Sequence, residues 1–131
     1  MNEIAHGVDM VECARMRQIV HRHGRRFLHR IFTPAELEYC LAKRRSIEHL
    51  AGRFAAKEAV LKVLGTGWQK GINWTDVEIR NAPSGRPLVR LTGLCRKIAA
   101  EQGLAAIVIS ISHVGSHAMA SAIATADHAT A

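Results

Sequence analysis

The chain has 131 residues, 48% of them hydrophobic and 22% charged, which is the composition of a globular protein and excludes a disordered one. This length predicts one domain, residues 1–131. The start, MNEIAHGVDMVE, does not have the pattern of a secretory signal, and no apolar stretch approaches the roughly 20 residues that cross a bilayer. Eighteen lysines and arginines against 11 acids give a formal charge of +7, which predicts a negatively charged partner: nucleic acid, a membrane surface, a phosphorylated ligand or an acidic protein.

The beginning of the chain predicts one strand followed by helices. A short strand is expected over Ile4–Val11, and apolar residues at helical spacing follow from Glu12 until Gly24 interrupts them. The next helix starts in TPAELEYCLAK, where Thr33 is the expected N-cap and Glu36 completes a capping box. These signals predict two helices directly after the first strand.

The longest predicted helix is SIEHLAGRFAAKEAVLKVLG, with Ser46 as its cap and Gly65 as its terminator. Beyond a glycine-rich loop, DVEIR and PLVRL read as strands joined by the turn residues of NAPSGR. TGLCRKIAAEQG predicts a short helix, and AAIVISISH and HAMASAIATA predict two apolar strands joined by VGS. The connections favour an α+β fold, with an antiparallel sheet packed against a long central helix and the N-terminal helices.

Two carboxylates lie within apolar stretches of this sequence. On a helical wheel, Glu58 shares the face of Phe54 and Leu61, where an ionised side chain is costly without a cation, a metal or a hydrogen-bonding ligand. Lys62, one turn later, offers the simpler interpretation of a surface ion pair. Asp9 follows a glycine in GVDMVE and either caps the next helix or belongs to a site.

Asp9 and Glu58 together predict a Mg²⁺ ion held against a phosphate. Mg²⁺ takes one or two protein carboxylates and fills its octahedron with water and phosphate oxygens. His113, in SISH at the end of an apolar strand, is placed to donate to a ligand. The cations expected to hold the remaining phosphate charge are Lys43, Arg44, Arg45, Arg53, Lys57 and Lys62.

Other classes of protein remain open on these residues alone. A nucleic-acid-binding module is the alternative, although the three Phe, two Trp and one Tyr do not alternate with basic residues as a base-stacking platform requires. A non-enzymatic subunit that binds Mg²⁺ or a nucleotide is a third possibility, and no GxSxG motif indicates a hydrolase. Cys13, Cys40 and Cys95 show no metal spacing and predict free thiols in a reducing cytoplasm.

Four segments in this order, GVDMVE, RFAAKEAVLKVLGTG, SGRP and SISH, resemble the holo-[acyl-carrier-protein] synthase family. This is the short, bacterial-type branch of the 4′-phosphopantetheinyl transferase superfamily, and the likeness runs from about Ile4 to Ala124. The resemblance implies the transferase fold and the transfer of 4′-phosphopantetheine from coenzyme A to a serine of apo-acyl carrier protein, a step of fatty acid biosynthesis. The leaving group would be adenosine 3′,5′-bisphosphate.

The same resemblance assigns roles to individual residues. It implies that Asp9 and Glu58 coordinate Mg²⁺ and that Lys62 contacts the same phosphates. The serine must lose a proton, and a water on the metal, Glu58 itself or a neighbouring group would serve as the base. The residues that the resemblance assigns to coenzyme A are Arg44, Arg45, Arg53, Lys62, Ser84, Gly85, Arg86, Pro87 and His113.

The resemblance also implies assembly and docking. Members of the family are typically homotrimers with active sites between neighbouring subunits. Their turn usually reads GKP, so Arg86 here replaces a lysine with a planar guanidinium. The residues expected to dock the acidic carrier protein are Arg15, Ile19, Arg26, Phe27 and Arg30 of the first helix, whose apolar members have a place in the core as the alternative.

Overall fold

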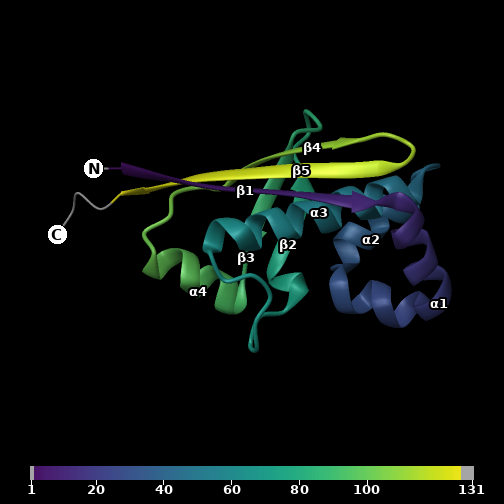
Figure 1. The fold of residues 1–131 in the computed structure, drawn as a ribbon, viewed down its shortest axis with the longest axis horizontal. Helices are drawn as coiled ribbons and strands as arrows, with labels where there is room; N and C mark the ends of the chain where they lie inside the picture. The colour runs from purple at the N-terminus through teal and green to yellow at the C-terminus, as the bar shows by residue number, and fades with distance from the viewer. Residues whose placement is uncertain (1, 128–131) are drawn as a thin grey trace.

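The computed structural model describes residues 2–127, which form an α+β fold as expected (Figure 1). The elements in chain order are β1 (Asn2–Glu12), α1 (Cys13–Ile31), α2 (Pro34–Leu41), α3 (Ser46–Leu64), the 3₁₀ helix η1 (Trp74–Asp76), β2 (Val77–Asn81), β3 (Pro87–Leu91), α4 (Gly93–Glu101), β4 (Val108–His113) and β5 (His117–Asp127). The long helix α3 is central, and α1 and α2 pack at one end of it (Figure 1).

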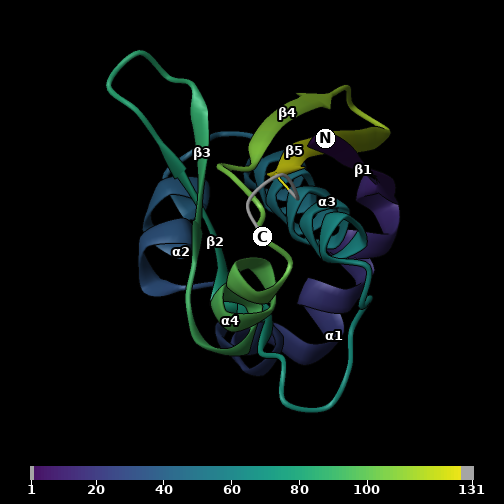
Figure 2. The ribbon, with the colours of Figure 1, turned by 90° about the vertical axis from the view of Figure 1, so that its left-hand side faces the viewer.

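The strands form two antiparallel sheets, where the sequence predicted one. β1, β5 and β4 make a three-stranded sheet in that order, and β2 and β3 make a separate hairpin. Figure 2 shows this hairpin standing apart from the larger sheet, with its turn projecting away from the helices. Among the described strands, β2 and β3 pair only with each other. In the larger sheet β5 is central, so β1 and β4 form opposite edges.

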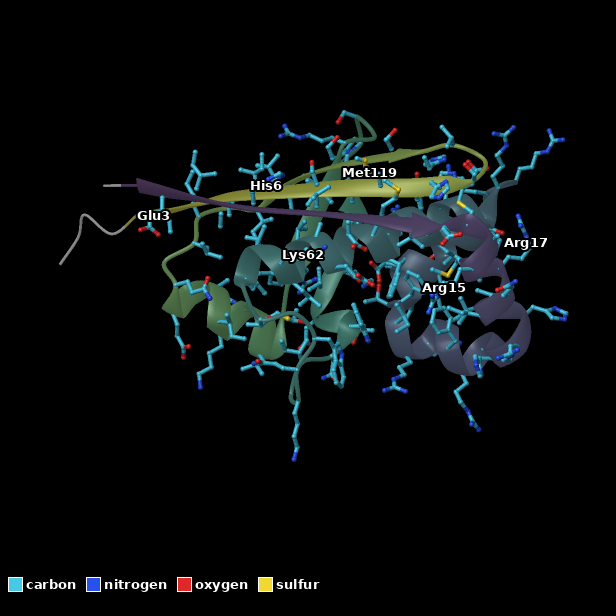
Figure 3. The ribbon with its side chains drawn as sticks, in the orientation of Figure 1. Glu3, His6, Arg15, Arg17, Lys62 and Met119 are labelled. Carbon is cyan, nitrogen blue, oxygen red and sulfur yellow. The ribbon has the colours of Figure 1, made fainter. Side chains whose placement is uncertain are left out.

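Alternation along β5 decides which face of the large sheet meets α3. Ala118, Ala120, Ala122 and Ala124 are all buried, whereas Met119 between them is exposed. Because side chains alternate along a strand, the alanines face α3 and their small size lets the helix lie close to the sheet. Figure 3 shows Met119 on the side of the sheet that faces away from α3.

Local signals in the sequence are mostly confirmed. Thr33 Oγ1 accepts a hydrogen bond from the Glu36 N–H at 3.2 Å, and the Thr33 N–H donates to Glu36 Oε1 at 2.8 Å, which is the predicted capping box. Gly24 interrupts α1 with φ 53°, and Gly65 ends α3 with φ 76°. The cap at Ser46 is wrong: its backbone is already helical, and the preceding residue occupies the N-cap position without a side-chain hydrogen bond.

The three cysteines are free thiols, as the sequence predicted, and all three are buried. Burial is the main reason that the pKa values of the Cys40 and Cys95 thiols rise to about 11, which makes both poor nucleophiles. Among residues 2–127, none of the helices combines the length and apolar character that crossing a bilayer requires.

Candidate functional site

Strand β1 crosses α3 at Gly7, and the contact is very close. A Cβ atom at Gly7 would lie 2.1 Å from the carbonyl oxygen of Ala59 and 2.8 Å from Cβ of Lys62. Only glycine allows this approach of strand to helix. Asp9 lies two residues further along β1 and therefore on the same face, so its carboxyl group also meets α3.

The Asp9 and Glu58 carboxyl groups hydrogen-bond to each other across this crossing. Two carboxyl groups can share a hydrogen bond only when one of them carries a proton. Burial is the largest of the causes that raise the pKa of Glu58 to about 7. The hydrogen bond and the charge of Asp9 act in the same direction, whereas the charge of Lys62 opposes them. Glu58 therefore exchanges its proton near neutral pH.

Lys62 completes this cluster from the next turn of α3. Its Nζ atom donates to the carbonyl oxygen of Val8 at 2.8 Å and to Asp9 Oδ1 at 3.2 Å. The Lys62 side chain is about half exposed, so solvent can reach it; Figure 3 labels it on α3, below the large sheet. The structure thus brings together Asp9, Glu58 and Lys62, the three residues that the sequence singled out.

The chemistry of this cluster fits a hard divalent cation. Asp9 and Glu58 offer carboxyl oxygens, and a cation between them would replace the proton that they share. Within residues 3–126, whose side chains the structure describes, no group of three or more His, Cys, Asp or Glu side chains is gathered as metal ligands. A metal held here would therefore take other ligands from outside those side chains, which is how Mg²⁺ binds with phosphate and water.

Lys57 does not belong to this cluster, and its expected role in holding phosphate is wrong. Its Nζ atom lies 2.8 Å from Glu36 Oε1, and neither side chain is exposed. Nζ also donates to the carbonyl oxygens of Trp74, at 3.2 Å, and Val77. Consecutive helical residues point about 100° apart, so Lys57 faces α2 and β2 while Glu58 faces β1.

A second group of candidate residues lies beside β4, at the other edge of the large sheet. It surrounds a cavity of about 150 Å³. The lining residues are Tyr39, His49, Gly52, Arg53, Asn81, Gly85, Pro87, Ile111 and His113. Four of these, Arg53, Gly85, Pro87 and His113, were predicted to contact coenzyme A.

Arg53 is the main positive charge of this cavity. It is only 4% exposed, its guanidinium group lies 4.0 Å from the ring centre of Tyr39, and Nη2 donates to Asn81 Oδ1. The Nε atom is buried and has no hydrogen-bond partner within the described chain. No carboxylate of residues 3–126 pairs with this guanidinium, so an anionic ligand would satisfy both the charge and the free N–H group.

His113 is held in the same cavity by two residues that sequence reasoning missed. Its Nδ1 atom lies 2.9 Å from Glu48 Oε1, and its ring centre lies 5.0 Å from that of His49. Burial, followed by the neighbouring His113, lowers the pKa of His49. A sequence signal existed, because His49 and Arg53 are one helical turn apart and therefore share a face of α3.

The remaining predicted phosphate contacts are exposed residues around this cavity. Arg45 Nε is 3.8 Å from Glu48 Oε2 at an exposed position, and Arg44 lines a separate hollow beside it. The Nζ atom of Lys43 lies 4.7 Å from the ring centre of Tyr39. In the β2–β3 turn, Ser84 and Arg86 are both exposed. All five side chains are exposed to solvent.

The two clusters do not meet within one chain. Asp9 is on β1 and His113 is on β4, with β5 between them. Neither Glu58 nor Lys62 lines the cavity around Arg53. One chain therefore carries two separate half-sites, one with paired carboxylates and one with a buried guanidinium.

The expected docking residues are spread over both halves of α1. Arg15 and Ile19 border a surface hollow of about 480 Å³ in the first half. Arg26 and Arg30 are exposed in the second half, beyond the kink. Phe27 is only half-buried, and its ring packs edge-on against a core phenylalanine 6.4 Å away, so the core uses part of its surface.

Comparisons with known proteins point to a single family. Residues 5–122 match the sequence model of the 4′-phosphopantetheinyl transferase superfamily. The holo-[acyl-carrier-protein] synthase of Desulforudis audaxviator is 51% identical over 118 residues, covering 90% of this chain and 89% of that protein. The structure of holo-[acyl-carrier-protein] synthase from Neisseria meningitidis has a TM-score of 0.84 at 30% identity and covers 92% of this chain and 96% of that one. The Helicobacter pylori synthase, solved in complex with coenzyme A, has a TM-score of 0.80 at 31% identity, covering 91% and 98%.

Proposed function

The chain belongs to the holo-[acyl-carrier-protein] synthase family of the 4′-phosphopantetheinyl transferases, and we propose that it uses Asp9, Glu58 and Lys62 to transfer the 4′-phosphopantetheine of coenzyme A to a serine of apo-acyl carrier protein. Adenosine 3′,5′-bisphosphate is the other product. The observation that carries the proposal is the close grouping of these three side chains where β1 crosses α3. The family match favours this reaction over the nucleic-acid-binding alternative.

Asp9 and Glu58 are the residues that would hold Mg²⁺ against the pyrophosphate of coenzyme A. Bound there, the ion would neutralise phosphate charge, which is the main requirement of phosphoryl-type transfer. Lys62 adds a second positive charge on the same side, and its half-exposed ammonium can move from Asp9 to a phosphate oxygen. Glu58 would have to be ionised to hold the cation together with Asp9, so binding of the ion would release the proton of Glu58.

The second half-site supports a role in binding the rest of coenzyme A. Arg53 offers a buried, unpaired guanidinium, and Gly85, Pro87 and His113 border the same cavity. The surrounding cations Arg44, Arg45 and Arg86, together with Ser84, would extend this contact to phosphate oxygens. Charged, polar and aromatic side chains all line this cavity, which suits a phosphorylated nucleotide better than an apolar ligand.

Assembly as a homotrimer would join the two half-sites. Within one chain they lie at opposite edges of the sheet, so a complete site needs the carboxylates of one subunit and the cavity of a neighbour. The sheet face away from α3 carries exposed apolar residues, which supports assembly through that face. These residues are Ile4, Val8, Met10, Val108, Met119 and Ile123.

The acyl carrier protein would dock on α1. Arg15, Arg26 and Arg30 are exposed and positive, and Ile19 borders a hollow beside Arg15 that an apolar side chain of the partner would fill. An acidic helix of the carrier would be steered to this surface by charge. The buried free thiols of the chain suit the reducing cytoplasm, where we place the reaction.

Mass spectrometry of apo-acyl carrier protein, incubated with the protein, coenzyme A and Mg²⁺, tests the proposal. Transfer adds one phosphopantetheine, a gain of about 340 Da expected from phosphoryl-type transfer of that group. The Glu58→Ala variant should fold and leave the carrier unmodified. Full labelling by that variant would contradict the role of Glu58, and an unmodified carrier with the unaltered protein would contradict the reaction itself.

A further inference from the structure

We propose that Asn81 is a positioning residue, which ties the turn between β2 and β3 to Arg53 and leaves the charge of Arg53 free for an anion. The inference rests on the proposed function, because it concerns the cavity assigned there to coenzyme A. Asn81 is the last residue of β2 and lines that cavity together with Arg53 and Gly85.

The side-chain amide of Asn81 makes two hydrogen bonds in opposite directions. Its Oδ1 atom accepts from Nη2 of Arg53, which belongs to α3. Its Nδ2 atom donates to the carbonyl oxygen of Gly85, in the turn, at 3.0 Å. Among residues 3–126, Asn81 is the residue whose side-chain hydrogen bonds connect the turn, residues 82–86, with α3. One amide therefore spans the gap between the hairpin and the helix.

The turn does not need Asn81 in order to form. The Ala82 N–H donates to the carbonyl oxygen of Arg86 at 2.9 Å, and the Gly85 N–H donates to that of Ala82 at 2.8 Å. Gly85 supplies the left-handed backbone that this turn requires, with φ 91°. Asn81 pairs with Pro87 in the last pair of the ladder before the turn. The amide of Asn81 thus sets where the turn lies relative to α3.

The neutrality of the amide matters as much as its geometry. A carboxylate at position 81 would also accept from Arg53, but it would cancel the positive charge that the cavity offers to a ligand. Asn81 orients the guanidinium as a neutral acceptor, and the ring of Tyr39 supports it from one face. Arg53 is therefore held in place, nearly buried and still without a carboxylate partner in the described chain.

Two substitutions separate the effect of charge at residue 81 from the effect of its hydrogen bond to the turn. Asn81→Asp keeps an acceptor for Arg53 but loses the donor to Gly85 and adds a negative charge. Asn81→Ala loses both hydrogen bonds and leaves the charge of Arg53 unchanged. Coenzyme A binding, measured by calorimetry over a range of salt concentrations, reports the charge, and amide hydrogen exchange of residues 82–86 reports the turn.

We expect Asn81→Asp to weaken coenzyme A binding by about tenfold and to make the binding less dependent on salt, because one cation is neutralised. Asn81→Ala should raise KM for coenzyme A more than it lowers kcat, keep the salt dependence, and speed amide exchange in the turn. Asn73→Ala is the matched control: Asn73 is an exposed asparagine just before the 3₁₀ helix η1, and it does not line the cavity.

Unchanged affinity and salt dependence in Asn81→Asp would overturn the charge argument, and unchanged amide exchange in Asn81→Ala would overturn the positioning argument. Failure of the unaltered protein to bind coenzyme A would instead contradict the proposed function. The exchange experiment needs no coenzyme A, so it tests the link between Asn81 and the turn in that case too.

Discussion

Gly7 faces the backbone of Ala59 so closely that a Cβ atom at residue 7 would lie 2.1 Å from the Ala59 carbonyl oxygen. This contact sets the distance between β1 and α3. Asp9 follows on the same face of the strand, so the Gly7–Ala59 contact also determines how far the Asp9 carboxyl group reaches toward Glu58. Gly7 therefore affects the site because it allows β1 to lie close to α3.

Gly7→Ala should destabilise the fold and separate the two carboxylates. The added methyl group meets backbone, which cannot move as a side chain can, and we expect a loss of about 3 kcal/mol in the free energy of unfolding. Chemical denaturation measures this loss. Gly115→Ala is the control, because a Cβ there meets nothing within 4 Å. Equal stability of the two variants would show that β1 and α3 are less tightly packed than described.

Lys57→Met should cost more stability than the same change at Lys62, the exposed lysine of α3. Glu36 would be left as a buried carboxylate without its cation, and the carbonyl groups of Trp74 and Val77 would lose their donor, for a loss of about 3–5 kcal/mol. Lys62→Met, from a half-exposed ion pair, should change stability by less than about 1 kcal/mol. Replacing the buried pair together, with Glu36→Leu and Lys57→Met, should recover only the part of the loss that comes from the unpaired charge, because the N–H groups of Thr33 and Ile79 then lose their acceptor. Thermal unfolding of the unaltered protein and of these three variants measures the differences in stability.

The pKa of Glu58 predicts a pH dependence of stability in the absence of metal. Because that pKa rises from its ordinary value of 4.5 to about 7 in the folded protein, the folded chain holds a proton in this interval that the unfolded chain releases. Stability from this group is thus present below pH 4.5 and is lost as the pH rises through about 7. Thermal unfolding with a chelator present, compared with Glu58→Gln, isolates the effect. Identical pH profiles for the two proteins would contradict it.

The same proton predicts how Mg²⁺ binding depends on pH. The ion competes with the proton shared by Asp9 and Glu58, so its apparent affinity should rise as the pH increases through about 7. Calorimetry in two buffers of different ionisation enthalpy should also detect release of a proton on binding. Binding without proton release would show that the metal does not displace the hydrogen bond between Asp9 and Glu58.

Reversing charge on α1 should change KM for the acyl carrier protein but not KM for coenzyme A. Replacing Arg15 and Arg26 with glutamate should raise KM for the acyl carrier protein by tenfold or more, because an acidic partner would meet like charge. KM for coenzyme A should stay nearly constant, since neither residue lines either half-site. Steady-state labelling with each substrate varied in turn measures both values. An equal rise in the two would reject docking on α1.

A charge on the outer face of the sheet should break the proposed trimer. Ile123→Asp introduces a carboxylate at an exposed apolar position of the central strand β5, and we expect monomers in analytical ultracentrifugation and loss of transfer. Leu41→Asp, at an equally exposed site on α2, is the control and should leave the oligomeric state unchanged. A monomer that transfers at the normal rate would contradict an active site shared between subunits.

Local sequence signals predicted the elements well because their physics is local. The capping box of Thr33 and Glu36, the kink at Gly24 and the terminator Gly65 each depend on a few adjacent residues, and each is present. Ser46 failed as a cap because a serine one residue inside the helix looks the same in sequence as one at its N-cap. Which residue begins the helix depends on the conformation of the preceding loop.

The sequence by itself determined that this chain is an α+β transferase of its family, and that Glu58 and Lys62 share a face of one helix, because helical periodicity and motif order are properties of the chain. Only the tertiary structure decided which neighbour each charged side chain meets: it buried Lys57 against Glu36 and joined Asn81 to Arg53. It also set the two half-sites on opposite edges of the sheet. The reason is that the rotation of α3 and the order of the strands follow from packing between distant segments, which no local pattern records.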